Sequence, residues 1–376
     1  MFTRIKQLFT GVNEEQEHLL NLLEAQAGRK ERVRVQQAIK KKQTSIKKRS
    51  FHIGEEETIY PEVRGEETLN QQLQEAAYKQ AYSTYSKNAY EEITQLIAPN
   101  ILGLEAIKKA AALQLFSQER IHILLLGDPG TGKTEILSSS KELASISSMG
   151  LGSGTTNAGL AVTYAKGEVH KGLLVQAHKG ICCIDELNLL KKEDQASLYN
   201  AMEKGFITYD KAGRSERFEA DVRVLATANP KGDCFTGEKI SELKKQLPFE
   251  SALISRFHLL FIIRKPDKEA FLEITRKIVK NEKKTTKNKD FAQAYIKHAQ
   301  KQSVKFPKHL EILVSEAAKK IKEAEEELLI EVSPRIINGI IGLSKASARM
   351  HLRETVKPED VRNALELYAE SLQITL

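Results

Sequence analysis

Apolar residues follow two different periods along the chain, and the change of period divides the sequence into regions. Between residues 96 and 265, short apolar runs typical of buried strands alternate with segments that have helical spacing. The four clearest runs are IHILLLG (121–127), GICCIDE (180–186), DVRVLATAN (221–229) and HLLFIIR (258–264). Strands that alternate with helices predict a parallel α/β sheet. We therefore expect an α/β domain over residues 96–265.

The regions on either side of this domain carry a helical pattern. Residues 266–376 predict an all-helical domain, interrupted by the charged turn KNEKKTTKNK at 280–289. Near the N-terminus, four apolar residues between positions 5 and 12 share one helical face, so residues 1–50 are expected to form a helical arm. Residues 51–95 are expected to form an acidic linker followed by a helix.

Composition narrows the class of protein. The chain has 376 residues, of which 41% are hydrophobic and 29% charged, which suits a globular protein rich in helix. No apolar run approaches the roughly 18 residues that a membrane span needs. The adjacent Cys182 and Cys183, with one further cysteine, form neither a disulfide framework nor a C-x-x-C zinc pair. We expect buried strand cysteines, no zinc, no membrane partner and a cytoplasmic setting.

The surplus of positive charge is confined to one segment. The net charge of the chain is +8, and the segment 29–49 alone carries +9 because it holds ten Lys and Arg against the single acid Glu31. Such a basic arm favours a polyanionic partner, most often nucleic acid. A solvated helix that serves solubility is the alternative interpretation.

A glycine-rich loop follows the first strand and carries the clearest chemistry. The loop GDPGTGKT matches G-x-x-x-x-G-K-[ST], the phosphate-binding motif, and a helical segment follows it. Its glycines let backbone amides surround a phosphate, and the next helix adds its positive N-terminal end. Lys133 is expected to reach the β- and γ-phosphates, and Thr134 to hold Mg²⁺. The expected nucleotide is ATP or GTP. The loop residues are Gly127, Asp128, Pro129, Gly130, Thr131, Gly132, Lys133 and Thr134.

Polar residues after three other strands predict the second half of this site. Asp185 and Glu186 end the strand 180–186, where Asp185 can hold Mg²⁺ and Glu186 can polarise the attacking water. Asn229 can orient the same water, although an Asn before Pro is also a common turn former. Arg256 is suited to the γ-phosphate of a neighbouring subunit, or else is a surface arginine.

In this order, the segments resemble the AAA+ ATPase core of the minichromosome maintenance (MCM) family, the replicative helicase motors of archaea and eukaryotes. The resemblance extends from about residue 97 to the C-terminus. Its most specific part is the block 201–230 followed by the ISRF segment. The segments that carry it are IAPNILGLEAIKKAAALQLF, GDPGTGKT, CCIDELN, AMEKGFITYDKAGRSERFEADVRVLATANP, LISRFHLLFII and SPRIINGIIGLSKASARMHL.

The resemblance implies a role for each candidate residue. Residues 127–134 become the Walker A loop, and the segment YDKAG becomes the tip of a hairpin in the central pore of a hexamer. A lysine on such a turn can follow phosphates without reading bases. The implied roles are Asp185 and Glu186 as Walker B, Asn229 as sensor 1, Arg256 as an arginine finger in trans, Arg335 as the sensor-2 arginine and Lys211 as the DNA-contacting lysine.

The resemblance therefore implies an AAA+ P-loop NTPase with a C-terminal helical lid and a helical N-terminal extension. It would hydrolyse ATP with Mg²⁺ in a homohexamer or a ring with related subunits, and bind DNA without sequence preference. The expected place is the nucleoid of an archaeal-type cytoplasm. The family's N-terminal DNA-binding domain and C-terminal winged helix are not recognisable here, and the segment 164–180 is short where the family carries its helix-2 insert. We expect a truncated form.

Two other functions stay open at this point. The segment IDELNLL is also similar to magnesium-chelatase and MoxR-type ATPases, which predicts a remodelling ATPase that acts on a protein partner. A non-catalytic ring subunit is the second alternative. The presence of Lys133, Asp185, Glu186 and Arg256 together argues against the latter.

Overall fold

The part of the chain that can be described excludes most of the N-terminal region. The computed structural model describes residues 78–165, 168–211, 214–232, 234–237, 239–279, 289–329 and 331–372. The basic arm and the apolar face predicted near the N-terminus lie outside these residues. The chain divides into two compact units, Met1–Asn88 and Ala89–Leu376, and every element named below belongs to the second.

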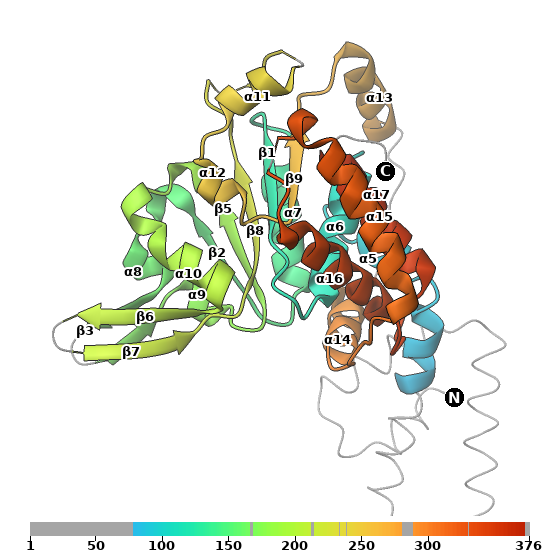
Figure 1. The fold of residues 1–376 in the computed structure, drawn as a ribbon, viewed down its shortest axis with the longest axis horizontal. Coiled ribbons are helices and arrows are strands. Elements are labelled where there is room, and N and C mark those ends of the chain that lie inside the picture. Colours follow the sequence, from blue (N-terminus) through green and yellow to red (C-terminus); the bar gives the residue numbers. More distant parts are fainter. Residues whose placement is uncertain are drawn as a thin grey trace, which may run out of the picture. The chain divides into compact units, whose positions relative to one another are not determined.

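Five parallel strands form the central sheet, in the order β2-β5-β8-β1-β9 (Figure 1). The predicted parallel α/β fold is confirmed, and each of the four predicted runs contains one of these strands. The sheet also contains an edge strand, SSMGL, whose polar composition gives no apolar signal. The strand bounds are β1 Ile123–Gly127, β2 Ser147–Leu151, β5 Ile181–Asp185, β8 Arg223–Ala228 and β9 Leu259–Ile263.

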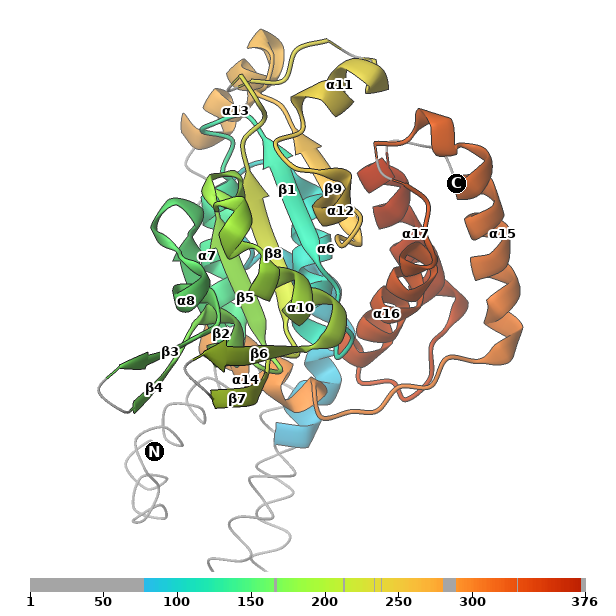
Figure 2. The ribbon, with the colours of Figure 1, turned by 60° about the vertical axis from the view of Figure 1, so that its left-hand side comes forward.

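Helices cover both faces of this sheet. Helices α6 and α7 lie on one face, and α10 and α12 lie on the other (Figure 2). The middle strands β1, β5 and β8 are buried along their whole length, as expected of a parallel sheet with two covered faces. The helices of this part are α5 Ala89–Thr94, α6 Glu105–Phe116, α7 Lys133–Leu143, α8 Asn157–Leu160, α9 Leu173–Gln176, α10 Ala196–Lys204, α11 Ile240–Gln246 and α12 Ser251–Ile254.

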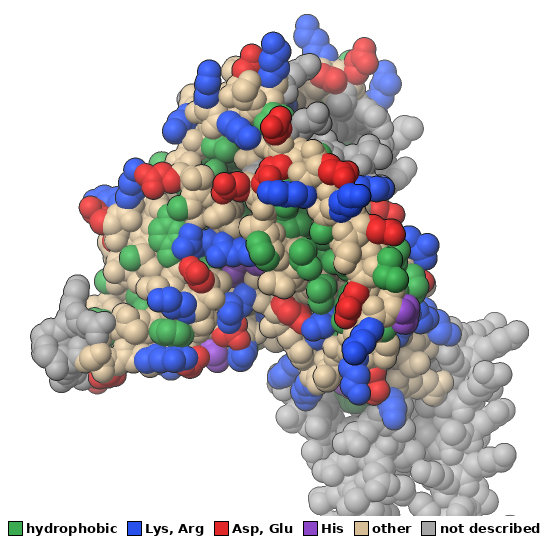
Figure 3. Space-filling view, in the orientation of Figure 1, with side chains coloured by type: hydrophobic (Ala, Val, Ile, Leu, Met, Phe, Trp, Pro, Cys, Tyr) green, Lys and Arg blue, Asp and Glu red, His purple; other side chains and the backbone are tan. Residues whose placement is uncertain are grey.

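Two antiparallel hairpins extend from one end of the sheet (Figures 1 and 3). The first pairs β3 (Val162–Ala165) with β4 (Glu168–Lys171), and the second pairs β6 (Phe206–Lys211) with β7 (Arg214–Glu219). The rings of Tyr164 and Tyr209 lie 4.7 Å apart between centroids, so the two hairpins contact each other.

The C-terminal region is helical, as predicted. Helices α16 and α17 pack against α6, and α17 also covers the outer edge of β9, where Leu260 N donates to Ser371 Oγ at 2.8 Å. None of the helices in the described ranges is both long and apolar enough to span a membrane. The bounds are α13 Lys268–Val279, α14 Lys289–Ala299, α15 Glu311–Glu323, α16 Pro334–Met350 and α17 Pro358–Leu372.

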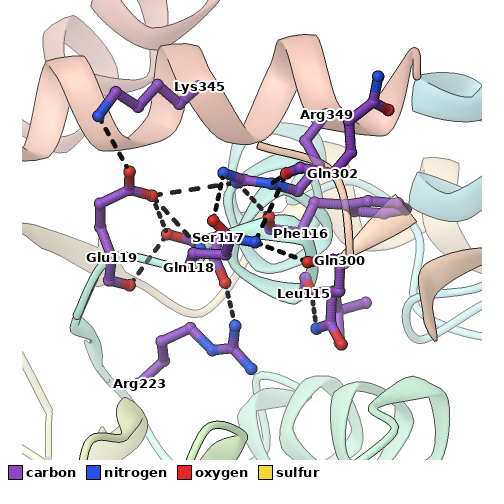
Figure 4. Close-up of polar contacts among 10 residues, drawn as sticks. All are labelled: Leu115, Phe116, Ser117, Gln118, Glu119, Arg223, Gln300, Gln302, Lys345 and Arg349. Carbon is purple, nitrogen blue, oxygen red and sulfur yellow. Dashed lines mark hydrogen bonds and ion pairs between the residues drawn. The ribbon is translucent and has the colours of Figure 1, made fainter. Parts of the chain in front are cut away.

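The segment 115–119, which contains the end of α6 and the residues that follow it, contacts two buried arginines and so joins the helical region to the sheet (Figure 4). We call this segment the linker. Arg349 of α16 is 1% exposed and donates to Phe116 O at 2.7 Å and to Gln302 O at 3.0 Å. Arg223, at the start of β8, donates to Ser117 O from the opposite side. The two guanidiniums supply donors to the carbonyls of the buried residues Phe116 and Ser117, so they fix the lid and the sheet to this segment.

We predict that Arg349→Gln lowers the free energy of unfolding by about 2–4 kcal/mol, because it leaves buried carbonyl acceptors without their charged donor. Urea denaturation of the purified chain measures the change. Arg362→Gln makes the same substitution at an exposed position of α17 and should change stability by less than about 0.5 kcal/mol. Equal losses in the two variants would contradict the assignment.

Candidate active site

The glycine-rich loop connects the end of β1 to the start of α7. A Cβ on Gly127 would lie 2.3 Å from Ile263 O of the neighbouring strand, so only glycine fits there. Gly130 and Gly132 adopt φ values of +77° and +84°, which side-chain-bearing residues rarely accept. The loop therefore brings its backbone amides and the N-terminus of α7 to one place. This arrangement is suited to an anion.

Lys133 lies at the centre of the loop. Its side chain is buried, and Nζ donates to Gly127 O and Asp128 O, both at 2.7 Å. Burial lowers the pKa of this ammonium, and the nearby carboxylates of Asp128, Asp185 and Glu186 oppose the shift. Three acidic groups thus help a buried lysine remain charged.

Asp128 holds the loop against the rest of the domain. Its carboxylate accepts hydrogen bonds from Phe235 N at 2.8 Å and from Lys265 N at 2.9 Å. Thr131 Oγ1 donates to the Asp128 carbonyl at 2.8 Å and closes the turn. Because both carboxylate oxygens accept from the protein backbone, Asp128 supports the loop rather than presenting a charge to a ligand.

Asp185 lies at the end of β5, beside the loop. Thr134 Oγ1 donates to Asp185 Oδ2 at 2.9 Å, and Thr227 Oγ1 donates to Asp185 Oδ1. Glu186 follows in the left-handed region, at φ +53°, and its amide donates to Thr227 Oγ1 at 2.9 Å. Thr227 therefore bonds both acidic residues and fixes the turn that separates their side chains.

Asn229 lies one residue beyond β8, at the same edge of the sheet. Its backbone amide donates to Asn188 Oδ1 at 3.0 Å, and Asn188 belongs to the 3₁₀ turn that follows Glu186. The ends of β1, β5 and β8 thus bring together five of the predicted residues. They are Lys133, Thr134, Asp185, Glu186 and Asn229.

The donor set at this edge fits a magnesium ion that also binds phosphate. Thr134 and Asp185 supply a hydroxyl and a carboxylate, the hard oxygen ligands that Mg²⁺ prefers, and Mg²⁺ takes its other ligands from phosphates and water. Among the described residues, His, Cys, Asp and Glu form no cluster of three or more that could hold a metal by themselves. A protein-only metal centre is therefore not supported in this part of the chain.

Arg256 and Arg335 lie together at the opposite end of the sheet, where strands β1 and β9 begin. Arg256 precedes β9, and Leu259, the first residue of β9, pairs with Ile123 at the start of β1. The glycine-rich loop begins at the other end of β1, at Gly127, which is four residues of about 3.3 Å each further along the strand. Arg256 Nη2 donates to Glu203 Oε2 at 3.0 Å, and Arg335 Nη2 lies 4.0 Å from Glu203 Oε1. We call these three residues the arginine cluster.

Lys211 is the last described residue of β6, before the turn of the second hairpin. It pairs in register with Arg214, and the turn residues between them lie outside the described ranges. The hairpin projects from the same end of the sheet as the first hairpin (Figures 1 and 2). Its predicted contact with DNA stays a prediction.

Sequence reasoning did not identify Thr227, Asn188 or Glu203. Thr227 gives a weak signal, since it is a polar residue inside the otherwise apolar strand run VRVLATA. Glu203 gives a better one, because a carboxylate near the C-terminal end of a helix is disfavoured by the helix dipole. Such a residue indicates that a cation lies nearby.

Two buried histidines connect the starts of β1 and β9 behind the arginine cluster. His122 Nδ1 accepts from Val224 N at 3.1 Å, so its Nε2 carries the hydrogen and donates to Met202 O at 3.1 Å. His258 Nδ1 accepts from His122 N at 3.1 Å. Burial and the nearby cations Arg335 and Arg120 lower the pKa of His258 to about 4. Burial and the neighbouring His258 also lower the pKa of His122, so both rings are neutral at neutral pH.

Comparison with known proteins identifies two family matches. Residues 79–282 match the MCM P-loop domain, and residues 290–372 match the MCM AAA-lid domain. The chain is 32% identical over 306 residues to DNA replication licensing factor mcm7 of Xenopus tropicalis, which covers 74% of this chain and 42% of that protein. It is 31% identical over 315 residues to the minichromosome maintenance protein MCM of Saccharolobus solfataricus, and the matched region covers 76% of this chain and 46% of that protein. The chain thus spans less than half the length of these relatives.

We predict that acid destabilises the protein through His258. Because its pKa falls from 6.5 in the unfolded chain to about 4 in the fold, the stabilisation is complete above pH 6.5 and is lost as the pH falls toward 4. The loss amounts to about 3 kcal/mol. His258→Asn keeps an acceptor near Nδ1 and removes the titration, so its free energy of unfolding should depend less steeply on pH over this interval. Urea denaturation at several pH values measures both slopes, and identical slopes would refute the prediction.

Proposed function

Because the chain belongs to the minichromosome maintenance (MCM) family, we propose that it hydrolyses ATP in a ring of subunits and uses the hydrolysis to move along DNA. The ring would be a homohexamer or a ring with related subunits. The relatives named above are a DNA replication licensing factor and a minichromosome maintenance protein, which favours chromosomal DNA as the polymer on which this chain acts.

The observation that carries this proposal is the separation of the two halves of the site. The phosphate loop and the acidic residues lie where the strands end, and the arginine cluster lies where they begin, about 13 Å away along β1. A single subunit therefore carries the phosphate loop at one end of the sheet and the guanidiniums of Arg256 and Arg335 at the other. A second copy that brings its arginine cluster to the first copy's loop would complete the site, and repetition of this contact generates a ring.

Each residue then has a chemical role. Lys133 and the loop amides bind the β- and γ-phosphates of ATP, and Thr134 with Asp185 would hold Mg²⁺, which neutralises phosphate charge when bound. Glu186 polarises the attacking water, and Asn229 orients it. Arg256 and Arg335 of the adjacent subunit stabilise the charge that develops on the γ-phosphate. The loop glycines and Asp128 keep this arrangement rigid.

The second hairpin supplies the proposed DNA contact. Lys211 lies at the end of a strand that starts directly after α10, the helix that carries Glu203. A lysine at this position can follow the phosphates of a strand without reading its bases. Hydrolysis at the subunit interface would then move the hairpin.

We predict that single-stranded DNA stimulates ATP hydrolysis by the purified chain, and that Lys211→Ala removes the stimulation while basal hydrolysis stays within about twofold. The reason is that Lys211 contacts the polymer and not the nucleotide. Phosphate release with and without DNA, repeated across salt concentrations, measures this effect, which should decrease as salt rises. Lys320→Ala, at an exposed position of α15 in the helical region, is the matched control.

A chain that hydrolyses ATP without any response to DNA, and for which Lys211→Ala is silent, would refute DNA as the partner. That outcome would favour remodelling of a protein partner instead.

We also predict that two inactive variants complement each other. Lys133→Ala lacks a working phosphate loop and Arg256→Ala lacks the arginine, so each homogeneous ring should lose at least about 100-fold in hydrolysis rate. In a mixed ring, the loop of the Arg256→Ala chain meets an intact Arg256 from its neighbour. Hydrolysis should therefore recover in part as the two proteins are titrated together. The absence of recovery in rings shown to contain both chains would refute an arginine that acts in trans.

A further inference from the structure

Glu203 occupies an electrostatically unfavourable place on its own helix. It lies one residue before the end of α10, where the negative end of the helix dipole disfavours a carboxylate. What offsets this cost is the pair of guanidiniums, since Arg256 Nη2 donates to Glu203 Oε2 at 3.0 Å and Arg335 Nη2 lies 4.0 Å from Oε1. One carboxylate thus faces two cations, one through each oxygen.

The two arginines come from different parts of the fold and repel each other. Arg256 follows α12 of the α/β domain, and Arg335 lies in the first turn of α16 in the lid. Burial lowers the pKa of Arg335, the charge of Arg256 lowers it further, and Glu203 counteracts both. The carboxylate between them is therefore what allows two like charges to stay together.

Backbone acceptors and a ring direct each guanidinium without neutralising it. Arg335 Nη1 donates to Ser255 O at 2.7 Å, and the Arg256 guanidinium stacks over the ring of Tyr199 at 4.4 Å. The Arg256 and Arg335 side chains remain 20% and 32% exposed, so both can still reach a ligand. Within the described ranges, Arg256 Nε is buried without a hydrogen-bond partner. This unmet donor disfavours the present position of the side chain, and a shift toward a new acceptor would relieve it.

From this geometry we infer that Glu203 is a positioning residue that holds Arg256 and Arg335 as one pair and presents them to the γ-phosphate of the adjacent subunit. The inference rests on the proposed function and concerns how that function is built. A triphosphate carries more charge than a carboxylate, so it can displace Glu203 from both guanidiniums at once. Glu203 itself touches no substrate.

A simple surface ion pair is the alternative, and it would contribute little to stability or activity. The two interpretations differ in which chain of a mixed ring must carry Glu203. A positioning residue matters only in the chain that donates the arginines, whereas a general effect on the fold matters in either chain.

The experiment uses the complementing variants Lys133→Ala and Arg256→Ala. Glu203→Gln is added to the Lys133→Ala chain, which donates the arginines, or to the Arg256→Ala chain, which donates the phosphate loop. In the first mixture we expect the recovered kcat to fall about tenfold with the KM for ATP unchanged, because the loop that binds ATP is intact. In the second mixture we expect no change, since that chain's cluster is already inactive.

Two further variants define the controls. Glu203→Asp keeps the charge and should restore part of the loss. Glu323→Gln removes an exposed glutamate whose ion pair lies within its own helix, and it should have no effect in either chain.

Each other result has a defined meaning. Equal loss in both mixtures, or no loss in either, would overturn the inference while the trans arrangement stands. An increase in the first mixture would show that Glu203 restrains the arginines, and would also overturn it. No recovery in the parent mixture without Glu203→Gln would instead overturn the proposed function, and the inference with it.

Discussion

The parallel pairing of β1 with β8 and β9 is the constraint on which the site depends. Together with the pairing of β5 and β8, it places the ends of β1, β5 and β8 at one end of the sheet, near Lys133, Asp185 and Asn229, and it leaves Arg256 at the opposite end, where β9 begins. Gly127 makes the pairing possible, since any side chain there would collide with Ile263. The same register that places the phosphate loop and the acidic residues at one end of the strands keeps Arg256 and Arg335 away from them, so the proposed catalysis requires a second subunit.

The arginine cluster and the second hairpin are joined by a single tight turn. Gly205, two residues after Glu203, has a φ of +78°, and it lies between the end of α10 and the start of β6. Met202, on the other side of Glu203, accepts a hydrogen bond from the buried His122 and so links α10 to the start of β1. The helix end that contacts the two arginines is thus also the one from which the hairpin extends. In the proposed ring, this would be a short mechanical route from the subunit interface to the DNA contact.

Sequence patterns predicted the site residues that lie in contiguous motifs. They did not reveal the residues whose role depends on contacts with distant parts of the chain. The loop 127–134 and the pair Asp185 and Glu186 are contiguous motifs beside apolar strands, so their positions followed from pattern alone. Thr227 and Glu203 act through partners 42 and 53 residues away, and no local pattern reveals such pairs. The polar edge strand β2 was missed for the related reason that its pairing with β5, and not its composition, makes it a strand.

The linker 115–119 has a consequence for how such proteins diverge. Arg349 of the lid and Arg223 of the sheet both donate to main-chain carbonyls of this segment, and backbone acceptors are present whatever side chains the linker carries. The side chains of Gln118 and Glu119 also contact Arg349, at 3.0 Å and 4.0 Å, so these two linker positions are tied to the lid. By contrast, the bonds to Phe116 O and Ser117 O do not depend on the side chains of those residues. A chimaera that exchanges lids between relatives would keep these hydrogen bonds between lid, linker and sheet only if both arginines were retained. Recombination should thus preserve the two arginines as a matched set.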